Sequence, residues 1–250
     1  MSAQPYFDAW TPSPLPRAGS HDALLPEVLA RAAACPQERV ASAVLELLAL
    51  QPGDAVLELG CGSGRMLAAV AARLRDGFVA GVDPSPLMVR HAAARNRRVI
   101  AQKRAQVSVA STPDLGAFPD ARFDRVFGTH VVYFWPDPAR DLAEVARVLR
   151  PGGLLLLGFF AGEEGERGRT RFAVARARRL LAEAGFRDVE ATASAACASA
   201  APLVFVQGRR GPGAPARSAA AGDERGALEP GRQAGRAPGL HARGPGARRA

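Results

Sequence analysis

The sequence predicts an α/β fold in which a mostly parallel sheet is covered by helices on both faces. Short apolar segments alternate along the chain with helical patterns, and this alternation is typical of parallel strands joined by crossover helices. The strand expected at 56–59 ends in three glycines at alternate positions, Gly60, Gly62 and Gly64, directly before a helical pattern. A glycine turn between a strand and a helix lets a ligand approach the backbone closely, and the free N–H groups of the helix start favour a negatively charged group.

The expected elements follow one another from residue 22 to residue 207. Residues 22–50 are mainly helical in pattern, and a Pro-Gly turn at 51–54 leads into the first strand. Further helices are expected at 64–75, 85–97, 138–149 and 170–184, the last ending at Gly185, which suits a helix C-cap. Further strands are expected at 78–82, 106–110, 123–128, 154–158, 187–193 and 202–207.

Length and composition favour one folded domain with a basic tail. At 250 residues, 48% of them hydrophobic, the chain can bury a substantial core. Residues 209–250 contain nine arginines against three acidic residues and few large apolar side chains, so we expect them to be disordered. A nucleic-acid-binding role for this tail is the alternative. Its arginines are scattered, however, and no aromatic side chains lie between them to stack on bases.

We divide the chain into an N-terminal helical or cap segment (1–39), a central domain with the glycine turn (40–208) and the tail (209–250). No signal peptide is evident and no apolar run is long enough to span a bilayer, so a cytoplasmic location is expected. The three cysteines, listed in chain order as Cys35, Cys61 and Cys197, are odd in number and far apart. They predict neither a disulfide framework nor a metal site.

A carboxylate follows the second strand. Asp83 ends this strand about twenty residues after the glycine turn, where nucleotide-binding α/β folds place an acidic residue that accepts hydrogen bonds from ribose hydroxyls. Alternatively, Asp83 caps the next helix, because Asp-Pro-Ser is also a good helix start. Both interpretations hold if Ser85 caps the helix and Asp83 reaches the ligand.

The glycine spacing distinguishes two kinds of nucleotide site. A dinucleotide-binding Gly-x-Gly-x-x-Gly would need a glycine at position 65, where this chain has Arg65. Residues 56–64 instead resemble motif I of the class I S-adenosylmethionine-dependent methyltransferases. Residues 118–124 and 137–153 are similar to that family's turn into its fourth strand and to the helix that ends in its Leu-Arg-Pro-Gly-Gly turn. Residues 132–138 are distantly similar to ubiquinone and menaquinone methyltransferases.

The resemblance implies a Rossmann-like, doubly wound sheet of about seven strands that binds S-adenosyl-L-methionine between about residues 40 and 208. It implies that the glycine turn wraps the methionine part of this cofactor, with Glu58 near the ammonium group, Asp83 at the ribose and Met88 near the adenine. Cys61 is expected to fill space rather than to act as a nucleophile. The cofactor-binding residues expected from the resemblance are Glu58, Gly60, Cys61, Gly62, Ser63, Gly64, Asp83, Pro84, Met88, Thr112, Pro113 and His130.

The adenine side departs from the family's pattern. Relatives often carry an acidic or amide residue after the third strand, whereas this chain has Ser111, Thr112 and Pro113 there. Either Thr112 makes one weaker hydrogen bond to the adenine, or a backbone group serves, or Asp114 takes over two residues along. These alternatives stay open from the sequence.

The acceptor side is expected after the fourth strand, because the carboxyl ends of parallel strands bind ligands in such sheets. His130 is a candidate general base and Tyr133 a second candidate catalytic residue. Alternatively, His130 is a wall of the cofactor pocket. Tyr133, Phe134 and Trp135 either line an apolar acceptor pocket or pack in the core.

Together these patterns predict a methyltransferase that moves the methyl group of S-adenosylmethionine directly, in line, to a small-molecule acceptor, with no covalent enzyme intermediate. The signature of nucleobase amino methylation is missing from the sequence, so a nucleic-acid substrate is not expected, and no metal ion is expected. An aminopropyl transferase on the same fold and a non-catalytic cofactor-binding or interaction protein are the alternatives. The sequence specifies neither the acceptor nor the oligomeric state.

Overall fold

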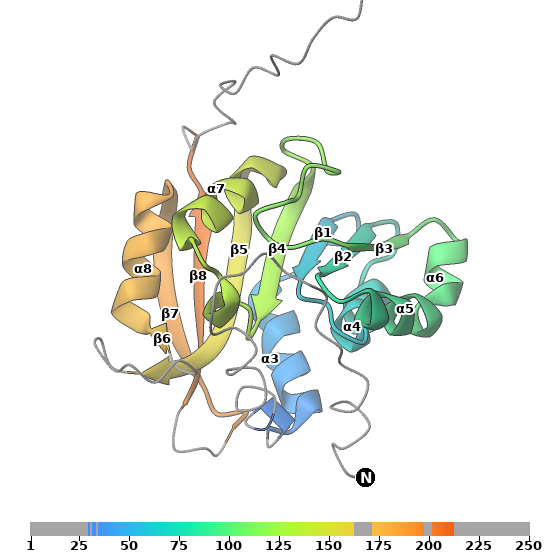
Figure 1. Ribbon diagram of the computed structural model, residues 1–250, viewed down its shortest axis with the longest axis horizontal. Helices are drawn as coiled ribbons and strands as arrows, with labels where there is room; N and C mark the ends of the chain where they lie inside the picture. Colours follow the sequence, from blue (N-terminus) through green and yellow to red (C-terminus); the bar gives the residue numbers. More distant parts are fainter. Residues whose placement is uncertain (1–29, 31, 34, 163–171, 198–201, 213–250) are drawn as a thin grey trace, which may run out of the picture. The chain divides into compact units, whose positions relative to one another are not determined.

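Seven strands cross the centre of the fold in the order β3-β2-β1-β4-β5-β8-β7, and a two-residue strand, β6, pairs with β5 outside this path (Figure 1). The computed structural model describes residues 30, 32–33, 35–162, 172–197 and 202–212. The strands are β1 Ala55–Leu59, β2 Phe78–Asp83, β3 Ala105–Val109, β4 Phe123–Thr129, β5 Leu149–Gly162, β6 Phe172–Ala173, β7 Phe186–Ser194 and β8 Leu203–Arg210. The helices are α3 Gln37–Leu48, α4 Arg65–Arg73, α5 Pro86–Arg95, α6 Arg97–Ala101, α7 Pro138–Val148 and α8 Val174–Glu183, with a 3-10 turn, η1, at Val132–Phe134.

The sheet is mostly parallel, as predicted. Every neighbouring pair from β3 across to β5 is parallel, whereas β8 runs antiparallel to both β5 and β7. The last strand of the described chain therefore lies inside the sheet, between β5 and the edge strand β7.

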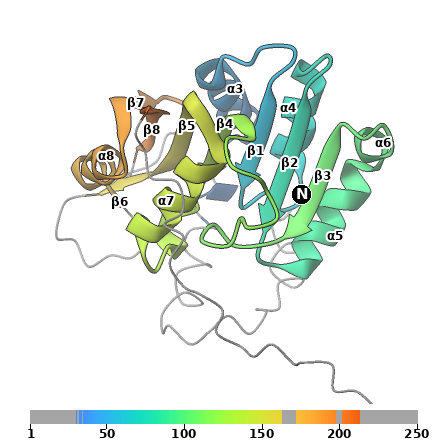
Figure 2. The same cartoon turned by 90° about the horizontal axis from the view of Figure 1, so that it is seen from above.

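Helices cover both faces of the sheet (Figure 2). On one face α3 and α4 contribute Val44, Leu48 and Leu67 to a buried apolar cluster. On the other face α7 and α8 contribute Leu142 and Leu181 to a second cluster. Each such side chain stabilises the fold by roughly 1.5–3 kcal/mol through burial, so the α/β class follows from two apolar layers that share one sheet.

Two helices begin with the caps that their sequences specify. Ser85 Oγ accepts a hydrogen bond from the Met88 N–H at the start of α5 (3.4 Å), so Ser85 is the helix cap, as expected. Asp137 Oδ1 accepts hydrogen bonds from the Ala139 and Arg140 N–H groups at the start of α7 (3.2 Å each). A proline follows both caps, at a position where its missing N–H has no helical partner to lose.

Two helices differ in extent from the prediction. The helix expected at 85–97 is split at Asn96, whose backbone leaves the helical region (φ −100°, ψ 13°) while its side chain hydrogen-bonds Gly64 across the turn. The helix expected at 170–184 begins only at Val174, directly after β6.

The prediction that the cysteines form no disulfide was wrong. Cys35 and Cys197, which are 162 positions apart in the sequence, form a disulfide with Cα atoms 4.9 Å apart. The pairing escaped the sequence analysis because only the sheet topology brings the residue before α3 next to the residue after β7. Cys61 is a buried free thiol.

Strand β8 extends further toward the C-terminus than predicted. Arg209 and Arg210, which we expected to open the disordered tail, belong to β8, and both side chains donate hydrogen bonds to carbonyl groups of β5. At the other end, α3 runs across the boundary placed between residues 39 and 40. The rest of the expected tail, from 213 on, and residues 1–29 lie outside the described residues. Within the described residues, no helix has the length and apolar character needed to cross a membrane.

A buried arginine fixes the loop between β3 and β4. Arg147 of α7 is 4% exposed and donates hydrogen bonds to Leu115 O (3.0 Å) and Phe118 O (2.9 Å). It also pairs with the carboxylates of Asp120 (2.7 Å) and Glu144 (3.0 Å). Since these contacts join α7 to the loop, they hold in place the segment on which the adenine-side residues were predicted.

Candidate cofactor site

The chain between β1 and α4 makes a tight turn at the carboxyl end of β1. Gly60, Gly62 and Gly64 have φ angles of 65°, 50° and 72°, in a backbone region that residues with side chains rarely adopt. A methyl group added at Gly60 would lie 2.6 Å from Val131 Cγ1, so the turn is packed against the segment after β4. Gly64 is the N-cap of α4, and the N–H groups of this helix start can bind a polar or anionic ligand.

Asp83, the last residue of β2, braces this turn. Its Oδ2 accepts a hydrogen bond from the Gly62 N–H and its Oδ1 accepts one from the Ser85 N–H, both at 2.9 Å. The residue is 8% exposed, and burial raises its pKa while the two N–H donors oppose the rise. Each carboxylate oxygen keeps a lone pair for a further donor, since an oxygen of this kind accepts two hydrogen bonds.

Glu58 lies within β1, below the turn. It is 4% exposed, and none of the described residues hydrogen-bonds its Oε2 atom. Burial, followed by the nearby charge of Asp83, raises the pKa of Glu58 well above its ordinary value. A buried carboxylate without a partner is costly, and a cationic group placed beside it would remove that cost.

Two residues that the sequence analysis missed hold the glycine turn from α5. Asn96, which is 2% exposed, donates to Gly64 O (3.0 Å), and Arg95 Nε donates to Ser63 O (3.0 Å). A methyl group at Gly64 would lie 2.6 Å from Asn96 Nδ2, so a side chain at position 64 would collide with Asn96. Asn96 gave no signal because its partner lies 32 residues away in the sequence.

On the adenine side, Thr112 is 9% exposed and its Oγ1 accepts a hydrogen bond from the indole Nε1 of Trp135 (3.1 Å). This bond joins the loop after β3 to the segment after η1. The neighbouring Pro113 is partly buried, whereas Asp114 is exposed. Trp135, for which both a pocket role and a core role were open, is partly buried and packs against the core.

His130 follows β4 with a left-handed backbone (φ 60°), and its N–H donates to Gly158 O of β5 (2.7 Å). Its ring lies 4.7 Å from the Phe160 ring and is stacked at 6.3 Å on the Tyr133 ring, distances that join ring centroids. Its Nδ1 atom is buried with no partner among the described residues. Burial lowers the pKa of His130 to about 4, so the imidazole is neutral near pH 7.

Tyr133 lies beside His130, so the structure brings the two candidate catalytic residues together. Tyr133 is 8% exposed, and its hydroxyl oxygen accepts a hydrogen bond from the Phe160 N–H of β5. Its ring belongs to the same buried cluster as the apolar residues of α7. This contact with Phe160, which the sequence did not indicate, makes Tyr133 part of the link between η1 and β5.

The part of the chain that forms this edge of the sheet is similar to known proteins. A family profile described as "Methyltransferase domain" matches residues 57–157. A solved structure of a SAM-dependent methyltransferase from Aquifex aeolicus superimposes with a TM-score of 0.58 at 21% identity, covering 68% of this chain and 88% of that one.

Two curated methyltransferases are similar to this chain in sequence. The chain is 34% identical over 122 residues to 27-O-demethylrifamycin SV methyltransferase of Amycolatopsis mediterranei (strain S699), covering 49% of this chain and 44% of the relative. It is 36% identical over 103 residues to aklanonic acid methyltransferase DauC of Streptomyces sp. (strain C5), covering 40% of this chain and 46% of the relative.

Residues 57–157 therefore match the methyltransferase domain family, and the fold is that of a SAM-dependent methyltransferase. The chain spans under half the length of these two relatives. The cofactor of the family is S-adenosylmethionine, and the region matched by the profile contains the glycine turn, Asp83 and His130.

Other residues predicted at the cofactor site are placed as follows. Cys61 is 5% exposed and points toward Gly81, where a methyl group would lie 3.0 Å from its Sγ atom; the thiol is thus a space-filling group, and burial raises its pKa. Pro84 is exposed and Met88 is partly buried at the start of α5. No group of three His, Cys, Asp or Glu side chains that could hold a metal ion occurs among the described residues.

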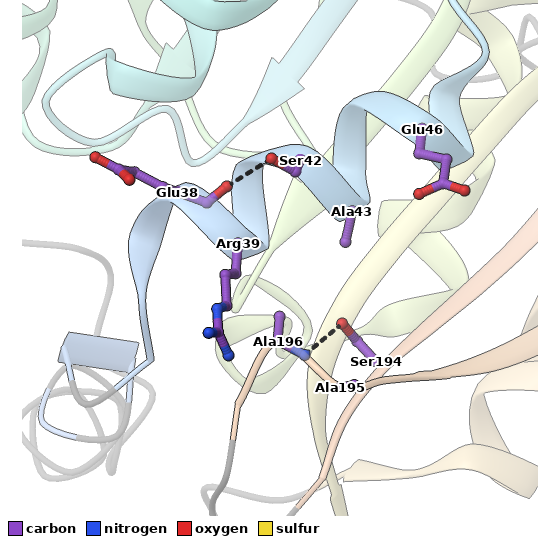
Figure 3. A pocket seen from close by; sticks show the side chains of 8 residues that line it. All are labelled: Glu38, Arg39, Ser42, Ala43, Glu46, Ser194, Ala195 and Ala196. Atoms are coloured by element: carbon purple, nitrogen blue, oxygen red, sulfur yellow. Dashed lines mark hydrogen bonds between the residues drawn. The ribbon is translucent and has the colours of Figure 1, made fainter.

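An open surface cavity of about 550 Å³ lies away from the glycine turn, between α3 and the chain that follows β7 (Figure 3). Figure 3 shows Arg39 reaching from α3 toward the segment that carries Ala196. The described lining residues are Glu38, Arg39, Ser42, Ala43, Glu46, Ser194, Ala195 and Ala196. No residue predicted to bind the cofactor lines this cavity.

Proposed function

We propose that this protein transfers the methyl group of S-adenosylmethionine to a small-molecule acceptor. The observation that carries the proposal is the arrangement at the carboxyl edge of the sheet: a glycine turn, the Asp83 carboxylate bonded to it, and the buried carboxylate of Glu58, whose Oε2 has no partner among the described residues. When bound, S-adenosylmethionine supplies an electrophilic methyl group on a positively charged sulfur.

The residues of this edge fit that cofactor by charge and by hydrogen-bonding capacity. Glu58 would hold the ammonium group, because a cation beside its free Oε2 would offset the cost of burying the carboxylate. Asp83 would accept the ribose hydroxyls with the lone pairs that Gly62 and Ser85 leave free. The N–H groups at the start of α4 would bind the carboxylate of the methionine part.

The aromatic rings after β4 and in β5 would form the acceptor side. His130, Tyr133 and Phe160 present apolar ring surfaces next to one another. A neutral His130 can accept a hydrogen bond from an acceptor hydroxyl and orient its oxygen. The similarity to two relatives, a demethylrifamycin methyltransferase and an aklanonic acid methyltransferase, supports an organic small molecule as acceptor.

Titration calorimetry with S-adenosylmethionine and a turnover assay test the proposal together. We expect micromolar cofactor binding and release of S-adenosylhomocysteine in the presence of hydroxylated polyketide-like acceptors. The Glu58→Gln variant should bind the cofactor at least ten-fold more weakly, because the amide lacks the negative charge that the ammonium group needs.

Three results would overturn the proposal in different ways. No heat of binding at millimolar cofactor would exclude a cofactor-dependent enzyme. Binding without turnover on a broad acceptor panel would instead favour the non-catalytic cofactor-binding protein. Turnover only with decarboxylated S-adenosylmethionine would favour the aminopropyl transferase.

A further inference from the structure

The Cys35–Cys197 disulfide lies where two distant segments of the chain meet. It joins the residue before α3 to the chain that follows β7, and its cysteines are 3% and 8% exposed. The Cα separation of 4.9 Å falls in the range that a disulfide requires. The backbone therefore places the two cysteines at the separation that the bond needs.

The chain beside the disulfide reaches the protein surface. Ala196, which precedes Cys197, lines the open cavity between α3 and the end of β7 (Figure 3). Arg39, the third residue of α3, lines this cavity as well.

The disulfide is packed into the core. Cys35 and Cys197 belong to the buried cluster that contains Phe160 and Leu203. These two residues are direct partners in the β5–β8 ladder, and Leu203 lies six positions after Cys197. Phe160 contacts the His130 ring and donates its N–H to the Tyr133 hydroxyl. The disulfide therefore shares one buried cluster with Phe160, which itself touches the candidate acceptor side.

We propose that Cys35 and Cys197 are a site of reversible oxidation that sets the packing of Phe160 and, through it, of His130 and Tyr133. In a reducing compartment, which the sequence predicts for this chain, permanent disulfides are rare and those that occur are usually redox-responsive. The site is independent of cofactor binding. Only its effect on acceptor turnover rests on the proposed function.

The oxidation is a thiol–disulfide exchange with a small-molecule disulfide such as oxidised glutathione. One cysteine thiolate attacks a glutathione sulfur, forms a mixed disulfide and releases one glutathione thiolate. The second cysteine thiolate then attacks the protein sulfur of the mixed disulfide and releases the second glutathione thiolate. The two protons lost by the cysteines end on two reduced glutathione molecules, and the two electrons lost by the cysteine sulfurs reduce the glutathione disulfide.

Thiol counting on the full chain tests whether the bond forms and reverses. After equilibration with oxidised glutathione, alkylation of the unfolded protein should label one of the three cysteines, Cys61, and after reduction it should label all three. Three labelled thiols in the oxidised sample, or a bond that an excess of reduced glutathione never opens, would overturn the proposal.

Hydrogen exchange tests the effect on the site without needing an acceptor. Reduction of the wild-type protein should accelerate exchange in the peptide that carries Phe160 about ten-fold, while the peptide with Gly62 stays unchanged. The Cys35→Ser variant should exchange like the reduced protein under both conditions, and Cys61→Ser should respond like the wild type. Equal exchange of the Phe160 peptide in both redox states would refute the coupling.

Calorimetry on the same samples separates this proposal from the proposed function. Affinity for S-adenosylmethionine should agree within two-fold between the oxidised and reduced protein. If neither state binds the cofactor, the methyltransferase assignment fails, while the thiol and exchange results still decide the redox site.

Discussion

Asp83 carries two structural bonds and one proposed ligand contact on a single carboxylate. Because its oxygens already accept the Gly62 and Ser85 N–H groups, the side chain is held in one orientation before any ligand arrives. A fixed orientation removes part of the entropy loss on binding. The capping and ligand interpretations of this residue were alternatives in the sequence, and the structure assigns the helix cap to Ser85.

We expect the Asp83→Asn variant to bind S-adenosylmethionine at least ten-fold more weakly. The amide replaces one acceptor oxygen by a donor, and losing one charge-assisted hydrogen bond costs roughly 1.5–3 kcal/mol. Titration calorimetry measures the effect. Asp76→Asn is the matched control, since Asp76 is exposed near the opposite end of β2; affinities that agree between the two variants would rule out the ribose role.

Protonation of His130 should destabilise the folded protein at acidic pH. Its pKa is about 4 in the folded state and about 6.5 in the unfolded state, so the unfolded chain binds more protons between these values. Stability is therefore unaffected by this group above about pH 6.5 and falls as the pH drops from 6.5 to 4. The loss approaches about 3 kcal/mol below pH 4.

The His130→Asn variant isolates this effect, because asparagine tolerates the left-handed backbone and does not titrate. Melting temperatures at pH 7.5 and pH 4.5 should fall more for the wild type than for the variant. If the melting temperatures of both proteins fall equally, the imidazole is already protonated, or free to be protonated, in the folded protein.

At the scale of elements, α5 acts on the glycine turn through its last residues. Asn96 ends the helix and at the same time holds the Gly64 carbonyl, so the helix end and the turn form one unit. The turn is thus shaped by a packed helix rather than by its glycines alone. This is a positioning role, since Asn96 is buried behind the turn.

Replacing Asn96 by aspartate keeps the shape of the side chain and removes the donor. We expect affinity for S-adenosylmethionine to fall about ten-fold, with circular dichroism unchanged at 20 °C, because the turn loses its fixed conformation. Arg98→Ala, an exposed change on the adjoining α6, serves as control. An affinity for the aspartate variant equal to that of the control would mean that the turn is rigid without this bond.

Arg147 provides the second test at this scale, on stability rather than binding. Arg147→Met should lower the free energy of unfolding by about 3–5 kcal/mol, because Glu144 and two loop carbonyls lose a buried partner. Urea denaturation measures the change. Arg140→Met on the exposed side of the same helix should stay within about 0.5 kcal/mol of the wild type; a similar small effect for Arg147 would show that the loop is held by other contacts.

For the whole molecule, the sequence was informative wherever the signal is local. The glycine turn, Asp83 after β2 and the Ser85 cap each depend on neighbouring residues, and the structure places them at one edge of the sheet. The α/β class followed from alternating strand and helix patterns.

The parts that could not be predicted depend on contacts between distant segments. Cys35 and Cys197 are 162 residues apart, and Trp135 meets Thr112 across 23 residues. Thr112 was considered only as an adenine contact, because nothing in its own segment indicates an indole partner. Such pairs depend on the topology of the fold. A single sequence indicates that topology only when it resembles a known family.

The interior place of β8 sets an order of assembly. A ribosome releases the chain from its N-terminus, so the five parallel strands from β3 to β5 can pair before β8 has been made. During that interval β5 and the incoming β7 each present an unpaired edge, and unpaired edges invite association with other chains. A chain that stops before Leu203 would keep both edges open permanently. Strand β8 therefore completes the sheet of a newly made molecule: until it has been synthesised, β5 lacks a neighbour and the sheet has an additional open edge.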